Sequence, residues 1–336
     1  MTGFALYRFP YEQQCTLVTG AVSELTSLNG LSACRGFVVA PFARSSQCPV
    51  LLIRPDDVSQ NPVSYPQLPS LGELPSPMSG TYPSDFAAFH NSLTSGHFQK
   101  LVLSRSLDIR RQDGEDAFAL FRKACEQYPR VFISLVFTPQ SGLWLTATPE
   151  VLLAGNGHEW QTMALAGTMP FAENIGWSDK NIQEQRYVAT YITEKLEHFS
   201  SDISEQGPRT VRAGHLAHLR SDFLFTLNDV NRLGSLIEAL HPTPAVCGLP
   251  KEEAFRFILD NEHNDRRYYS GFMGPLHLMS ETRLFVTLRC MQIFRDGYRL
   301  YAGGGLLRDS QEEQEWQETE AKLETMRRLL NSQIVK

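Results

Sequence analysis

The sequence has few features that would place the protein in a membrane, on nucleic acid or outside the cell. No segment of its 336 residues approaches the run of roughly 18–20 apolar residues that spans a bilayer. The first residues, MTGFALYRFPYEQQ, have no basic stretch followed by an apolar one, unlike a secretory signal. The net charge of −6 leaves no positive surplus for binding phosphate backbones. We therefore expect a cytoplasmic protein with no membrane or nucleic-acid partner.

Cysteine is scarce and scattered, and no two cysteines form a C-x-x-C pair. This spacing argues against a zinc site and favours reduced thiols. Hydrophobic residues make up 42% of the chain and charged residues 20%, which excludes wholesale disorder and a coiled coil. The cysteines are Cys15, Cys34, Cys48, Cys125, Cys247 and Cys290.

Proline is concentrated in one stretch, with seven prolines between residues 55 and 83. Because proline fixes φ and removes a backbone donor, this stretch is predicted to be an extended surface connection. It divides an N-terminal part, residues 1–83, from a core, residues 84–336. Apolar runs at 36–40 and 50–53 predict strands in the N-terminal part. That part is too short to bury a good core alone, so we expect one structural domain overall.

The remaining chain mixes helical and strand patterns. Short turns between successive strands indicate antiparallel neighbours, and the order of elements predicts an α+β fold. Ser310 and Glu313 have the spacing of a capping box for the last helix. Helices are expected at 86–93, 115–128, 179–199, 236–240, 252–259 and 311–330. Strands are expected at 99–109, 131–137, 142–148, 151–154, 160–165, 269–276, 284–294 and 299–307.

The last helix carries acidic residues on one face. Glu315 and Glu318 lie three residues apart, and Lys322 follows four residues after Glu318. A surface explanation is available, because acidic residues favour a first turn and Glu–Lys pairs are common at this spacing. However, three glycines at 303–305 precede the helix and let backbone amides approach an anion closely. This combination suggests an anion site beside a cation site.

Other candidate residues have both structural and functional explanations. Arg289 lies within an apolar segment that is predicted to be a strand, so its guanidinium needs a carboxylate from the protein, for example Asp265, or from a ligand. Lys100 can equally point to solvent, and Glu150 can be a carboxylate in a turn. His241 can have a purely structural role in a rigid turn.

Taken together, these segments resemble the chorismate-utilising enzymes, and the isochorismate synthases most closely. The resemblance covers about residues 84–330 and implies a single α+β domain with layered antiparallel β-sheets and helices packed outside. It is carried, in order along the chain, by KLVLSR at 100–105, TPE at 148–150, ALAGT at 164–168, HPTPAVCG at 241–248, YSG at 269–271, VTLR at 286–289, AGGG at 302–305 and EWQE at 315–318.

The resemblance also implies roles for individual residues. Lys100 matches the general base that activates water, and Glu150 matches the general acid that protonates the departing hydroxyl group. The implied metal ion is Mg²⁺, held by Glu184 and Glu318 with Glu315 as their partner. The implied substrate-binding positions are Thr168, His241, Tyr269, Arg289, Gly303 and Lys322.

Two departures from the family pattern affect the expected metal site and a nearby ion pair. The family usually has an acidic residue three positions before the metal-binding glutamate and a histidine directly after it. Asn181 and Gln185 stand there in this sequence, so the metal site is expected to carry less negative charge. Asp265 and Arg266 match an acidic–arginine pair that often has Glu in the first position.

The implied reaction adds a nucleophile at C2 of chorismate and removes the C4 hydroxyl group. Lys100 resembles the lysine of members that add water, and Ala166 differs from the nucleophilic lysine of aminodeoxychorismate synthases. We therefore expect an isomerase, isochorismate synthase, that serves menaquinone or siderophore biosynthesis, with menaquinone favoured and a monomeric state. A salicylate synthase and a non-catalytic chorismate-binding paralogue stay open as alternatives.

Overall fold

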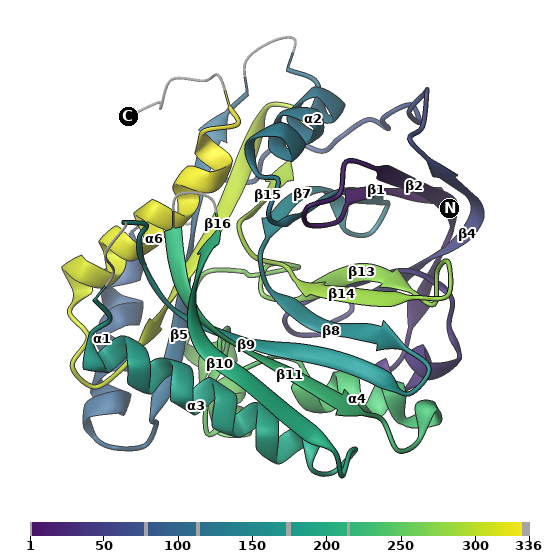
Figure 1. Ribbon diagram of the computed structural model, residues 1–336. Helices are drawn as coiled ribbons and strands as arrows, with labels where there is room; N and C mark the ends of the chain where they lie inside the picture. Colours follow the sequence, from purple (N-terminus) through teal and green to yellow (C-terminus); the bar gives the residue numbers. More distant parts are fainter. Residues whose placement is uncertain (1, 77–79, 112–114, 173–175, 214–215, 331–336) are drawn as a thin grey trace.

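The computed structural model describes residues 2–76, 80–111, 115–172, 176–213 and 216–330 (Figure 1). The helices are η1 (Leu28–Ala33), α1 (Tyr82–Thr94), α2 (Ala117–Gln127), α3 (Asp179–Leu196), η2 (Val230–Arg232), α4 (Leu233–Leu240), α5 (Lys251–Asn261) and α6 (Glu312–Arg327). The first eight strands are β1 (Thr2–Arg8), β2 (Cys15–Leu25), β3 (Gly36–Ala40), β4 (Val50–Gln60), β5 (Lys100–Arg110), β6 (Phe132–Thr138), β7 (Gly142–Thr148) and β8 (Val151–Asn156). The others are β9 (Glu159–Pro170), β10 (Ile203–Ala213), β11 (Leu216–Thr226), β12 (Gly248–Leu249), β13 (Phe272–Leu276), β14 (Thr282–Val286), β15 (Cys290–Ile293) and β16 (Gly297–Leu306).

The strands form one continuous antiparallel sheet. Its order is β10-β11-β9-β8-β14-β13-β3-β4-β2-β1-β6-β7-β15-β16-β5-β12. In Figure 1 the sheet curls from β9–β11, past β4, to β16 and β5. The N-terminal strands β1–β4 lie in the middle of this order, so they connect the two halves of the sheet. This arrangement confirms the predicted single α+β domain.

The two halves of the sheet face each other around a core built from strands and loops. This core includes Tyr7, Phe37 and Trp144. The outer faces are covered by helices, because α3 and α4 contribute to a second apolar cluster, α2 and α6 to a third, and α1 and α5 to a fourth. Helices therefore pack outside a folded sheet, as the family resemblance implied.

The predicted strand at 284–294 is wrong, because the structure divides it into β14 and β15. The break contains Arg289, whose φ of 49° lies in the left-handed region that few non-glycine residues adopt. β14 belongs to one half of the sheet and β15 to the other, so the chain crosses between the halves at this break. Arg289 therefore lies at the crossing and not within a strand.

Other local predictions also need correction. The helix α6 begins without a side-chain cap, and the Ser310 hydroxyl accepts a hydrogen bond from the Leu307 amide, so the predicted capping box is absent. The prediction of an extended connection from residue 55 missed the continuation of β4 to Gln60. The sequence analysis also missed four strands, β1, β2, β10 and β11. Their polar and apolar residues alternate less regularly. Within the described residues, no helix is both long and apolar enough to cross a membrane.

We expect Phe132→Ala to lower the free energy of unfolding of the whole domain, because this side chain joins the two halves of the sheet. Phe132 on β6 stacks on Phe285 of β14, with ring centroids 4.0 Å apart and an interplanar angle of 1°. Removing a buried aromatic side chain costs about 3–5 kcal/mol, because burial is lost and a cavity remains. Urea denaturation measures this change. Leu259→Ala, at an exposed position, is the control and should change the free energy of unfolding by no more than about 0.5 kcal/mol.

Candidate active site

One cavity lies between the curled sheet and the helices α3 and α6. Its walls come from segments far apart in the sequence, including the turn after β7, the end of β9, β11, the β14–β15 break and β16. The charged or hydrogen-bonding side chains that line it are Glu150, Thr168, Glu184, His218, Tyr269, Tyr301, Arg289 and Lys322, with Gly303 and Gly305. Most of the predicted site residues are therefore brought together.

Lys100 is not among the residues that line the cavity but contacts one of them, Glu184. As the first residue of β5 it is fully buried, and its Nζ lies 2.9 Å from Glu184 Oε1. The other oxygen of Glu184 accepts a hydrogen bond of 3.3 Å from the Gly167 amide. Burial alone would raise the pKa of Glu184, but Lys100, Lys322 and Lys180 together hold it below its ordinary value. Glu184 is thus an ionised carboxylate that links α3 to β5.

Glu150 follows β7 directly after Pro149 and is 2% exposed. Its Oε1 accepts a weak hydrogen bond of 3.4 Å from the Thr243 hydroxyl. Burial raises the pKa of Glu150 to about 7, although the positive charges of Lys100 and Arg289 oppose this shift. A carboxyl group with such a pKa holds its proton near neutral pH and can donate it.

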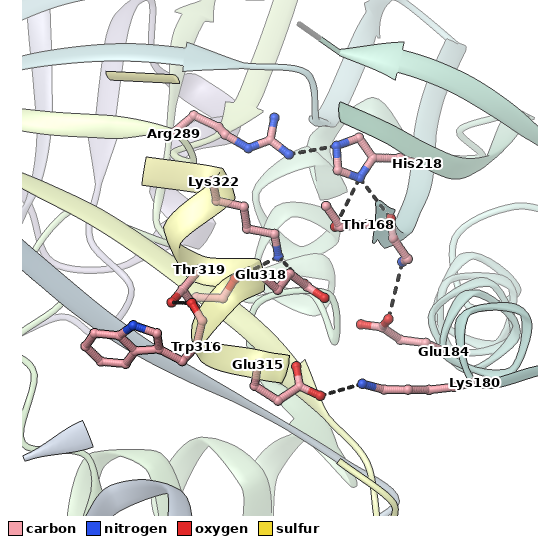
Figure 2. Close-up of polar contacts among 12 residues, drawn as sticks. Thr168, Lys180, Glu184, His218, Arg289, Glu315, Trp316, Glu318, Thr319 and Lys322 are labelled. Carbon is pink, nitrogen blue, oxygen red and sulfur yellow. Dashed lines mark hydrogen bonds and ion pairs between the residues drawn. The ribbon is translucent and has the colours of Figure 1, made fainter. Parts of the chain in front are cut away.

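Arg289 is held by a histidine that the sequence analysis missed (Figure 2). The Arg289 Nη2 donates to His218 Nε2 over 2.7 Å, and the His218 Nδ1 donates to the Gly167 carbonyl over 2.9 Å. Burial and the charge of Arg289 lower the pKa of His218 well below its ordinary value, so the ring is neutral. Burial likewise lowers the pKa of Arg289, to about 10, which leaves it charged at neutral pH.

Asp265, which the sequence analysis offered as an internal partner for Arg289, makes a different contact. The carboxylate of Asp265 accepts a hydrogen bond of 3.1 Å from the Arg267 amide. Arg266 does not pair with Asp265 but with Glu262, whose Oε1 accepts from Arg266 Nη2 over 2.9 Å. Among the described residues, no carboxylate forms an ion pair with Arg289. Its charge is therefore available to a ligand in the cavity.

Two carboxylates on α6 face the same space, and each is paired with a lysine (Figure 2). Lys180 on α3 pairs with Glu315, and Lys322 Nζ lies 2.7 Å from Glu318 Oε1 and donates to the Gly303 carbonyl over 2.8 Å. Burial and the neighbouring Glu318 raise the pKa of Glu315, although Lys180 opposes this shift. Of the predicted face of α6, Lys322 lines the cavity, whereas Glu315 and Glu318 lie beside it. Lys180 is a neighbour that the sequence analysis did not include.

Glu184, Glu315 and Glu318 have the oxygen donors that Mg²⁺ prefers. Within the described part of the chain, however, no three carboxylate, histidine or cysteine side chains are close enough to hold one ion as they stand. Each of the three carboxylates is instead paired with one lysine. Oε2 of Glu315 is buried and accepts no hydrogen bond, so its lone pairs are free to bind a metal ion. The donor chemistry thus fits Mg²⁺, provided that the lysine pairs open.

The glycines of β16 leave room for these side chains. A Cβ at Gly305 would lie 2.2 Å from Glu184 Oε1, and one at Gly303 would lie 2.8 Å from the Tyr269 hydroxyl. Any larger residue would therefore displace a site residue. Tyr269 is nearly fully buried and stacks on Tyr301 with centroids 5.6 Å apart, while the Thr168 hydroxyl lies 3.3 Å from His218 Nδ1.

His241 lies away from this cavity. Its Nε2 donates to the Pro41 carbonyl over 3.0 Å, its ring meets Phe272 edge to face, and it borders a different pocket. Burial lowers the pKa of His241 to about 3, so it is neutral. Gln185, at the position expected for a histidine, is fully buried behind the site, where its amide donates to the Ala164 carbonyl over 3.2 Å.

Comparisons with known proteins agree with this architecture. Residues 57–331 match the family model "Chorismate binding enzyme". The isochorismate synthase EntC of Escherichia coli is 30% identical over 238 residues, covering 68% of this chain and 61% of EntC. The isochorismate synthase DhbC of Bacillus subtilis is 30% identical over 256 residues, covering 71% of this chain and 64% of DhbC. The matched region thus spans less than two thirds of either relative.

Two solved structures share the fold. DhbC of Bacillus anthracis, described as specific for 2,3-dihydroxybenzoate, superimposes with a TM-score of 0.83 at 25% identity, covering 97% of this chain and 95% of that one. MenF of Escherichia coli, a menaquinone-specific isochorismate synthase, gives a TM-score of 0.81 at 23% identity, covering 98% and 89%. The chain therefore belongs to the chorismate-binding enzyme family, and isochorismate synthases are among its relatives.

We expect Glu150→Gln to stabilise the protein at alkaline pH but not at acidic pH. The pKa of Glu150 is about 7 in the folded protein, above its ordinary value of 4.5, so the folded state favours the protonated form. Ionising the buried carboxyl group lowers the free energy of unfolding. This loss begins as pH rises above 4.5 and reaches its full size above about 7. The neutral amide avoids this cost, which amounts to at most about 3 kcal/mol.

Urea denaturation at pH 5 and pH 8 measures the effect. The free energy of unfolding of Glu150→Gln should exceed that of the wild type more at pH 8 than at pH 5. Glu126→Gln, at an exposed position of α2, should change little at either pH. An equal change for Glu150→Gln at both pH values would contradict the raised pKa.

Proposed function

We propose that this protein is an isochorismate synthase, which converts chorismate to isochorismate by adding water at C2 and removing the C4 hydroxyl group in the presence of Mg²⁺. The observation that carries the proposal is the buried Glu150, which holds a proton near neutral pH in the same cavity as an unpaired arginine and close to a lysine. Removing hydroxide requires an acid, and activating water requires a base. A cytoplasmic monomer is proposed with it.

Glu150 is the proposed general acid. Its proton is held in a dry environment, so it can be delivered to the departing C4 hydroxyl group without competition from bulk water. Thr243 fixes the orientation of the carboxyl group through its hydroxyl. After the hydroxyl group leaves as water, Glu150 is ionised, and the nearby charges of Lys100 and Arg289 stabilise that form.

Lys100 is the proposed general base. Its Nζ is ion-paired with Glu184 Oε1, so it can accept a proton from water only after this contact opens and the ammonium group has released one proton to solvent. Gly305 leaves the space between them free of a side chain, because a Cβ there would approach Glu184 Oε1 within 2.2 Å and Lys100 Cε within 2.9 Å. Small movements of both side chains are therefore sterically possible.

The substrate carboxylates are proposed to bind to Arg289, Tyr269 and Lys322, with Thr168 and the backbone at Gly303 beside them. A guanidinium offers two parallel N–H groups to a carboxylate, and Arg289 has no other anionic partner in the described part of the chain. His218 positions Arg289, since it accepts from Nη2 and leaves the remaining donors free. His241 is not included, because it lies in another pocket.

Glu184, Glu315 and Glu318 are the residues that would hold Mg²⁺. Bound there, the ion would supply positive charge to a ring carboxylate. Opening the three lysine–glutamate pairs would free both the carboxylate oxygens and the lysine Nζ groups, of which Lys100 and Lys322 then face the substrate.

Product analysis tests the proposal. The purified chain is incubated with chorismate and Mg²⁺, with and without a chelator, and the products are identified by chromatography and mass spectrometry. Isochorismate that forms only with Mg²⁺ would support the proposal. Salicylate with pyruvate would identify a salicylate synthase instead. Binding of chorismate without turnover would identify a non-catalytic paralogue.

We expect Lys100→Ala to lower kcat by roughly 10²–10⁴ with a smaller change in KM, because one acid–base group contributes about that much to the rate. Lys195→Ala, in the last turn of α3, is the control and should leave kcat unchanged. If Lys100→Ala changed KM alone, the lysine would bind substrate and would not act as the base.

Arg289→Lys is expected to raise KM at least tenfold although it preserves the charge. An ammonium group cannot reproduce the planar, two-pronged contact of a guanidinium with a carboxylate. Arg299→Lys is a matched control, because Arg299 makes such a contact with Asp108 outside the cavity, at 2.8 and 2.9 Å. A lower Tm with unchanged KM for Arg289→Lys would show that Arg289 has only a structural role.

A further inference from the structure

Outside the cavity, Arg8 is a buried guanidinium without a carboxylate partner among the described residues. It lies at the end of β1 and is 2% exposed. Its Nη1 donates to the carbonyls of Phe9 and Pro129, over 3.0 and 2.8 Å, and its Nη2 donates to the Tyr128 carbonyl over 2.7 Å. Its Nε is buried and has no hydrogen-bond partner. A buried positive charge of this kind favours a nearby anion.

Two cysteines lie next to this guanidinium. Cys15 is opposite Arg8 in the β1–β2 register, and Cys125 is on α2. Arg8 also donates to the carbonyl of Tyr128, which follows Cys125 by about one helical turn, so the guanidinium lies between the strand that carries Cys15 and the end of α2 that carries Cys125. Both are partly buried in the same apolar cluster, so neither is sealed from small reagents. Their elements are separate in sequence, yet both cysteines lie at the same end of this cluster, where Arg8 contacts β2 and α2.

The surroundings of the pair favour ionisation of one thiol. The hydrogen bond from Cys125 and the charge of Arg8 lower the pKa of Cys15 to about 7, although burial opposes this shift. Cys125 keeps its proton, because its hydrogen bond to Cys15 and burial both raise its pKa. The backbone of Cys15 is fixed by Asn61, through hydrogen bonds of 2.7 and 3.0 Å. A thiolate therefore faces a thiol at a defined place.

We propose that Cys15 and Cys125 form a dithiol that hydrogen peroxide converts to a disulfide, with Arg8 as the counter-charge of the Cys15 thiolate. The Cys15 sulfur attacks one peroxide oxygen, the O–O bond breaks, and a sulfenic acid and hydroxide form. The Cys125 sulfur then attacks the Cys15 sulfur, the S–O bond breaks, and hydroxide leaves and takes up the Cys125 proton. The two thiols lose two electrons and peroxide becomes two waters.

The test treats the wild-type chain with hydrogen peroxide and maps disulfides by mass spectrometry without reduction. Digestion with trypsin and Glu-C separates Cys15 from Cys34, because Glu24 lies between them. The expected result is a Cys15–Cys125 cross-link that dithiothreitol reverses. Peroxide treatment that oxidises Cys34 while Cys15 and Cys125 stay as thiols would overturn the proposal.

Two further measurements keep the proposal falsifiable. In Cys125→Ser, peroxide should give a Cys15 sulfenic acid that dimedone traps, since the second thiol is missing. In the untreated wild type, iodoacetamide should modify Cys15 at least tenfold faster than Cys34, a half-buried thiol that contacts the Gly30 carbonyl. Equal alkylation rates, or no dimedone adduct on Cys15, would show that Arg8 does not activate this thiol.

Discussion

The site depends on a balance of buried charge. Three glutamates and three lysines from β5, α3 and α6 are brought together, and each carboxylate faces one ammonium group. Their burial ranges from the fully buried Lys100 to Lys180, whose side chain is 33% exposed. An unpaired charge at the depth of Lys100 or Glu184 would cost several kcal/mol, so this pair holds α3 against β5. The same pairs make the site responsive, because a divalent cation that binds their carboxylates, or a substrate carboxylate that binds Lys322, must exchange partners with them.

The break between β14 and β15 determines where the substrate is expected to bind. A regular strand would place successive side chains on alternate faces of one sheet. At this break the chain leaves one half of the sheet for the other, and Arg289 takes a left-handed conformation. Backbone strain of this kind persists only where the surroundings enforce it. Here His218 and the adjoining strands hold the guanidinium in the cavity.

Burial has different effects on two carboxyl groups of the cavity, those of Glu150 and Glu184. Glu150 is buried and forms no ion pair among the described residues, so its pKa rises and it keeps a proton. Glu184, at a similar depth, touches Lys100 directly and stays ionised. Two carboxyl groups of the same type therefore have pKa values shifted in opposite directions in one cavity, and their partners decide the direction. The Cys15–Cys125 pair follows the same principle at a distance from the site.

The sequence by itself determined the fold class, the family and most of the residues around the cavity. Local patterns carry this information: alternation for β5–β9, helical spacing for α3 and α6, and short motifs for Glu150, Arg289 and Glu318. It could not determine the break at Arg289, because the apolar run at 284–294 reads the same whether the strand is continuous or divided. The positions of His218, Lys180 and His241 were decided only by tertiary structure. His218 meets Arg289, and Lys180 meets Glu315, across 71 and 135 residues of sequence, and contacts at that separation leave no local pattern.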